Sequence, residues 1–158
     1  MNKRSASNRL SSAMSLFAAV ALLCLPALAS LGGDVSSVEA DGAHMKASAN
    51  VSQTSAYQVH EMKASTGTVV KEYVSPAGRV FAVSWHGPFV PDMQQILGAY
   101  FQQYSAALQA QHHQYGRHPI NIQESGFVVQ TGGHMRAYTG RAYVPGMLPQ
   151  GVQADEIK

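Results

Sequence analysis

The most constraining feature of this sequence is the stretch from Arg79 to Gln111, in which a short apolar run leads into one strongly amphipathic segment. Large apolar residues recur there every three or four positions, which places them on one side of an α-helix: Met93, Ile96, Leu97, Tyr100, Phe101, Tyr104 and Leu108. Asp92 occupies the N-cap position, with Gln95 as the expected partner in a capping box. Because burying one helical face does not offset the backbone entropy lost on ordering, this helix requires a sheet to pack on.

Three strands are predicted before the helix. Residues 56–63, 68–74 and 79–85 are rich in β-branched and aromatic side chains, and turns at 64–67 and 75–78 separate them. Connections this short favour an antiparallel meander. In the third strand, alternation places Phe81, Val83 and Trp85 on one face, where we expect the helix. The other face then carries Val80, Ala82, Ser84 and His86.

Two more strands are predicted after the helix, as a hairpin over residues 127–144. The Gly132-Gly133 pair is expected to form its turn, and Gly140 is expected to mark a β-bulge. The element order βββ-α-ββ predicts an α+β fold: an antiparallel sheet of about five strands with one long amphipathic helix packed on one face.

Residues 1–29 have the pattern of a cleaved signal peptide. Basic residues precede an apolar run from Leu16 to Leu25, and Ala27-Leu28-Ala29 supplies the small residues of a cleavage site. A transmembrane anchor is the alternative, but the run is shorter than the ~20 residues needed to span a bilayer. We therefore expect a periplasmic or secreted protein that contacts a membrane only through this peptide before cleavage.

Removal of that segment changes the charge and redox arguments. Three of the 11 Lys and Arg residues leave with it while all 9 Asp and Glu residues stay, so the net charge becomes −1. A general nucleic-acid or anionic-membrane surface is therefore not supported. Cys24, the single cysteine, is also lost, which excludes a disulfide in the mature chain.

The remaining chain is expected to form one domain. Residues 30–55 lack aromatic residues and periodicity and are predicted to be a disordered lead-in, although docking of 31–33 or 35–38 is an alternative. Residues 56–145 form the predicted α+β domain, and 146–158 an irregular tail.

The best candidate binding residues lie in the last hairpin. His134, Arg136 and Tyr138 alternate onto one face of the predicted strand, with Arg141 beyond the expected bulge. Such a column can bind a carboxylate or phosphate, although it is equally typical of the solvated face of a sheet. The hypothesis is a non-enzymatic binding module for an unknown ligand or protein partner, with an anionic one favoured and no cofactor.

Catalysis and metal binding are weaker alternatives. A small hydrolase would use Ser84 with His86 or His134, but residues two apart on a strand stand roughly 6–7 Å apart, too far for a nucleophile and its base. A metal-handling protein would use the histidine cluster at His112, His113 and His118, yet no H-E-x-x-H motif occurs. The corner at residues 85–91 marks a contact patch if Phe89 is exposed.

Several motifs in combination carry a family resemblance. They are Lys71-Glu72-Tyr73-Val74, the run Val80–Trp85 followed by Gly87-Pro88, Gly132–Ala137, and Gly140–Pro145. Together they resemble a proteobacterial exported family known only as domain of unknown function 2844. The resemblance implies an exported single-domain protein with no assigned activity, so it supplies no catalytic residues.

Overall fold

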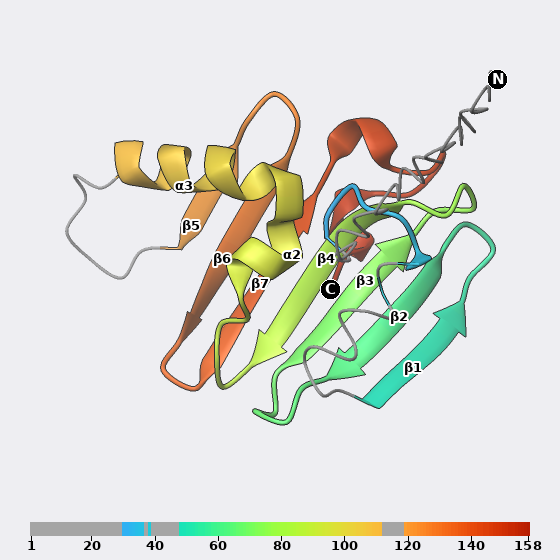
Figure 1. Cartoon of the computed structure of the whole chain (residues 1–158), viewed down its shortest axis with the longest axis horizontal. Coiled ribbons are helices and arrows are strands. Elements are labelled where there is room, and N and C mark those ends of the chain that lie inside the picture. The colour runs from blue at the N-terminus through green and yellow to red at the C-terminus, as the bar shows by residue number, and fades with distance from the viewer. Residues whose placement is uncertain (1–29, 37, 39–47, 112–118) are drawn as a thin grey trace, which may run out of the picture.

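The computed structural model describes residues 30–36, 38, 48–111 and 119–158. These residues form one antiparallel sheet in the order β1-β2-β3-β4-β7-β6-β5, with the helical segment across one face (Figure 1). The strands are β1 (Ser48–Gln53), β2 (Gln58–Lys63), β3 (Val69–Val74), β4 (Val80–Gly87), β5 (Ile120–Gln123), β6 (Val128–His134) and β7 (Ala137–Tyr143). The helices are α2 (Met93–Leu97) and α3 (Phe101–Ala110), joined by a 3₁₀ turn at Gly98–Tyr100. Within the described residues, no helix has the length and apolarity needed to cross a membrane.

The α+β class and the antiparallel sheet are confirmed, but the sheet has seven strands rather than five. The two additional strands, β1 and β5, are the edge strands. β1 is mostly polar, β5 has only four residues, and each has only one neighbouring strand. Their conformation therefore depends mainly on backbone hydrogen bonds to β2 and β6, and a hydrophobic pattern is weak in β5 and missing in β1.

The segment predicted to be a disordered lead-in packs on the domain where the structure describes it. The Leu31 amide donates to the Ile96 carbonyl at 2.9 Å, and the Gly32 amide donates to the Val80 carbonyl at 2.8 Å. Leu31 and Val38 are both buried in the core. The prediction of disorder is wrong for these residues, and the alternative of docking holds, because two apolar side chains and paired backbone groups tie the segment down.

The helix begins as predicted and then breaks. The Asp92 carboxylate accepts hydrogen bonds from the Gln94 amide at 2.9 Å and the Gln95 amide at 3.3 Å, which confirms the N-cap. The predicted continuous helix is interrupted at Gly98, whose φ of 50° lies in the left-handed region. A side chain at Gly98 would overlap Ser30, so the break makes room for the N-terminal segment.

The sheet has an apolar core on each face. Beneath the helix, Val83 and Trp85 pack in one core with Ile96, Leu97 and Tyr104. The second core, on the opposite face, contains Tyr73, Phe81, Ala82, Val152 and Ile157.

Phe81 therefore lies on the face away from the helix, which corrects the predicted alternation. Tyr73 pairs with Ala82 while Val74 pairs with Val80, so an irregularity leaves Phe81 as an extra residue in β4. Such an insertion changes the alternation on its N-terminal side and leaves Val83 and Trp85 on the expected face.

The C-terminal tail covers the second core. It is irregular, as expected, with short 3₁₀ turns at Pro145–Met147 and Ala154–Glu156. Its end is held by Tyr73, whose hydroxyl donates to the Lys158 carbonyl at 2.7 Å and accepts from the Lys158 amide at 2.9 Å. The tail is thus part of the folded domain.

Two predictions about the last hairpin are wrong. The turn lies at Met135-Arg136, between the paired residues His134 and Ala137, and the two glycines lie inside β6. Gly140 does not mark a bulge, because β7 keeps an unbroken register with both β4 and β6. Instead, a Cβ atom at Gly140 would overlap the Trp85 indole, so this glycine makes room for the largest core side chain.

Candidate functional site

The continuous register of β7 separates the predicted binding residues. Ala142 belongs to the core beneath the helix, so Tyr138, four residues earlier, faces the same side. Arg141 faces the opposite side of the sheet, which we call the open face. His134 is exposed at the end of β6, and Arg136 is exposed in the turn with a φ of 64°. Of the four, Arg141 alone belongs to the lining of the pocket described next.

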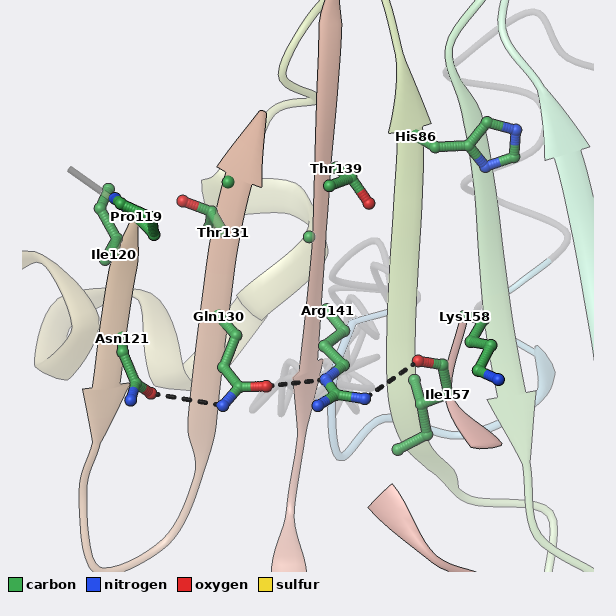
Figure 2. A pocket seen from close by; sticks show the side chains of 12 residues that line it. His86, Pro119, Ile120, Asn121, Gln130, Thr131, Thr139, Arg141, Ile157 and Lys158 are labelled. Carbon is green, nitrogen blue, oxygen red and sulfur yellow. Dashed lines mark hydrogen bonds between the residues drawn. The ribbon is translucent and has the colours of Figure 1, made fainter. Parts of the chain in front are cut away.

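That pocket is an open groove of about 640 Å³ between the open face and the tail (Figure 2). We call it the groove. Strands β4 to β7 and the tail each contribute to its lining. Its polar side chains are His86, Asn121, Gln130, Thr131, Thr139, Arg141 and Lys158.

Arg141 is held in place by hydrogen bonds to groups on both sides. Its Nε donates to Oε1 of Gln130 at 2.8 Å, and its Nη1 donates to the carbonyl of Ala154 at 2.7 Å. Gln130 in turn donates from Nε2 to Oδ1 of Asn121 at 3.5 Å, which extends the row across β5, β6 and β7 (Figure 2). Within the described residues, Nη2 of Arg141 has no such bond and can donate to a bound molecule.

A glycine lies in the lining of the groove. Gly132 pairs with Thr139, which pairs on its other side with His86. A Cβ atom at Gly132 would meet no heavy atom within 4 Å, so the space above it is open. His86 itself is exposed.

The groove contains basic side chains and no acidic ones among the described residues. His86, Arg141 and Lys158 line it, and the lining among the described residues includes no Asp or Glu. A guanidinium held by neighbouring acceptors is suited to a planar carboxylate or to a phosphate. The groove is therefore chemically suited to an anion.

The proposed residues of the hydrolase alternative do not form a catalytic arrangement in the described structure. Ser84 is 3% exposed, and its hydroxyl lies 3.4 Å from that of Tyr73. Ser84 pairs with Arg141, and His134 pairs with Ala137, so the two sites are separated by four residues of β7, roughly 13 Å. Ser84 and His86 share the open face as predicted, but no hydrogen bond joins them within the described residues.

The metal alternative depends on a cluster of ligating side chains. In the part of the chain that the structure describes, no three His, Cys, Asp or Glu residues are placed to hold an ion together. His112, His113 and His118, the cluster singled out from the sequence, lie outside the described residues.

Sequence reasoning missed most of the groove. Asn121, Gln130 and Thr139 are ordinary polar strand residues, and nothing local distinguishes them from a solvated face. One usable signal was the alternation in Ile120-Asn121-Ile122-Gln123, which is typical of a strand with one polar face. Lys158 enters the groove only because the tail folds back across the sheet.

Comparison with known proteins identifies a family but no function. No curated protein and no solved structure matches this chain. A family model described as a protein of unknown function, DUF2844, matches residues 27–157, which is most of the chain and includes every described strand and helix. The chain therefore belongs to the DUF2844 family.

Proposed function

We propose that this protein is a non-enzymatic binding module that holds a small anionic ligand, a carboxylate or phosphate compound, in the groove. The observation that carries the proposal is the guanidinium of Arg141, which Gln130 and Ala154 hold in place, while Nη2 makes no hydrogen bond to another described residue. A positioned guanidinium binds an anion without the entropic cost of ordering a long side chain.

The neighbouring groups support an anion over other ligands. His86 and Lys158 add basic groups, while Asn121 and Thr139 supply hydrogen-bonding groups that can orient a ligand. Among the described residues no Phe, Tyr or Trp side chain lines the groove, so it lacks the large apolar ring on which a sugar or base commonly stacks.

Isothermal titration calorimetry with inorganic phosphate, acetate and succinate tests the proposal. Gly132→Leu should fill the groove and weaken binding at least tenfold, because the new side chain enters open space. Gly146→Leu is the matched control, since a Cβ there also meets no heavy atom within 4 Å but lies outside the groove lining. Equal binding by both variants and wild type would exclude the groove as the site.

Arg141→Gln gives an independent test of the charge. It should abolish phosphate binding even where the variant unfolds at a lower temperature, so folding is checked by circular dichroism at the titration temperature. Native mass spectrometry of the purified protein would also reveal a co-purified ligand. If none of the three anions binds and no ligand co-purifies, the proposal is wrong.

We also propose that the protein is exported and acts in the periplasm or outside the cell. The basic, apolar and small-residue regions of 1–29 support this. The intact mass of protein from a secreting host tests it. Loss of residues 1–29 is the expected result, and the uncleaved mass would contradict it.

A further inference from the structure

Three loops leave the sheet at the same end. The register pairs Lys63 with Val69, Val69 with His86 and Gly87 with Tyr138, so β2, β3, β4 and β7 all terminate there. The loops are β2–β3 (residues 64–68), β4–α2 (88–92) and β6–β7 (135–136). Figure 1 shows them together at the lower end of the sheet.

Exposed apolar side chains concentrate on these loops. Among the described residues, the exposed large hydrophobic side chains are Phe89 (57%), Val90 (50%), Met135 (66%) and Val51 (55%). The first three belong to the β4–α2 and β6–β7 loops, and we call them the loop-end patch. Val51 lies on the edge strand β1. Exposed apolar residues gathered on neighbouring loop tips indicate a contact surface.

The backbone holds Phe89 in this exposed position. The Thr68 hydroxyl donates to the Phe89 carbonyl at 2.9 Å and accepts from the Phe89 amide at 3.3 Å. Thr68 is itself only 2% exposed, so it joins the β4–α2 loop firmly to the start of β3. The outward projection of Phe89 is thus part of the fold, and binding a partner through it requires little further ordering.

Basic side chains border the patch. Arg136 is in the same turn as Met135, His134 precedes it, and Lys63 ends β2 beside the β2–β3 loop; all three are exposed. The acidic residue of these loops, Asp92, uses its carboxylate to cap α2. The end of the sheet therefore combines apolar tips with local positive charge, although the net charge expected of the mature chain is −1.

We propose that the loop-end patch binds peripherally to an anionic membrane surface. Phe89, Val90 and Met135 enter the interface between headgroups and acyl chains, while Arg136 and Lys63 contact anionic headgroups. A protein partner is the weaker fit, since a stable interface buries about 800 Å² on each side and this patch consists of three side chains on two loops. The net charge expected of the mature chain does not support binding to an anionic membrane. That value sums over the whole chain, however, whereas the charged side chains that border the patch are basic.

Phe89→Trp provides a local reporter of insertion in the full chain. With vesicles of phosphatidylcholine and phosphatidylglycerol, the introduced indole should shift its emission to the blue and be quenched by brominated acyl chains. Trp85 contributes a constant background because it is 2% exposed. Val51→Trp is the matched control, an exposed apolar position on the edge strand β1 outside the loop-end patch, and should show neither effect. This local readout remains valid even if residues 1–29 also attach the chain to vesicles.

Arg136→Glu tests the charge. In the Phe89→Trp background it should weaken partition into vesicles that contain phosphatidylglycerol by roughly tenfold and leave partition into pure phosphatidylcholine nearly unchanged. The proposal is overturned if the Phe89→Trp indole is not quenched, or if the Val51→Trp indole is quenched equally. A blue shift that grows with protein concentration without vesicles would show self-association instead and would also overturn it.

Discussion

The indole of Trp85 lies against Gly140 across the β4–β7 ladder, so closely that a Cβ atom on Gly140 would be 2.6 Å from Cε2 of the ring. Trp85 is 2% exposed, and its position beneath the helix depends on the missing side chain. The same pairing keeps β7 in regular register, which directs Arg141 to the open face and Tyr138 to the other. One glycine thus positions both the core and the groove.

Gly140→Ala should destabilise the protein by about 3 kcal/mol, because the added methyl group forces the indole out of a packed core. Urea denaturation followed by Trp85 fluorescence measures the effect. Gly132→Ala in the neighbouring strand is the control and should change the free energy of unfolding by less than about 0.5 kcal/mol, since its Cβ meets open space. Equal values for the two variants would contradict the proposed role of Gly140.

The tail should contribute to stability despite its irregular backbone. Ile157 is 2% exposed in the second core, so Ile157→Ala should lower the free energy of unfolding by roughly 2–4 kcal/mol. Met135→Ala also shortens an apolar side chain but at an exposed position, and should cost less than about 0.5 kcal/mol. Thermal unfolding of both variants makes the comparison. An unchanged midpoint for Ile157→Ala would mean that the tail is not docked in solution.

Arg136 should be replaceable by glycine with a gain in stability. Its φ of 64° is unfavourable for a residue with a side chain by roughly 1–2 kcal/mol, and the entropic cost of glycine offsets only part of this. We expect Arg136→Gly to stabilise the protein by about 0.5–1 kcal/mol and Arg136→Ala to be nearly neutral. Chemical denaturation distinguishes them. A large loss of stability in Arg136→Ala would instead show that the guanidinium has a structural role.

Stability should fall at alkaline pH as tyrosines ionise. Burial raises the pKa of the Tyr104 phenol, and burial together with the Glu156 carboxylate and Tyr73 raises the pKa of Tyr57. Above pH ~10 the unfolded chain releases these protons before the folded protein does, so the folded state binds more protons and the free energy of unfolding decreases with pH. Below that pH the two tyrosines contribute no pH dependence.

Tyr104→Phe isolates this effect. The variant should lose less stability than wild type between pH 9 and pH 11 in denaturation experiments, because the buried ring can no longer ionise on unfolding. Absorbance at 295 nm should show one fewer late-titrating phenol. Parallel stability curves for the two proteins would exclude Tyr104 as a contributor.

The parts of this fold with strong local signals were predictable from the sequence. The meander from 56 to 85 has dense β-branched and aromatic residues with turns between, and the helix has a regular apolar stripe with Asp92 at its start. The edge strand β1 has neither signal, and β5 has only the short alternation of Ile120 to Gln123; pairing with a neighbour stabilises both. The Arg-based binding face remains a prediction. Arg141 and Tyr138 were expected on one face because of a bulge at Gly140, and the unbroken register of β7 places them on opposite faces.

The sequence alone determined the family, the α+β class and the amphipathic helix, since these depend on composition and on periodicities that hold over neighbouring residues. The tertiary structure decided which residues meet. Phe81 changed faces because of an irregularity opposite Tyr73. The position of Gly140 has no room for a side chain because the Trp85 indole fills that space. The tail places Lys158 beside a groove formed by strands far apart in the chain. Register and long-range packing depend on contacts between segments far apart in the chain, and no local pattern of residues encodes them.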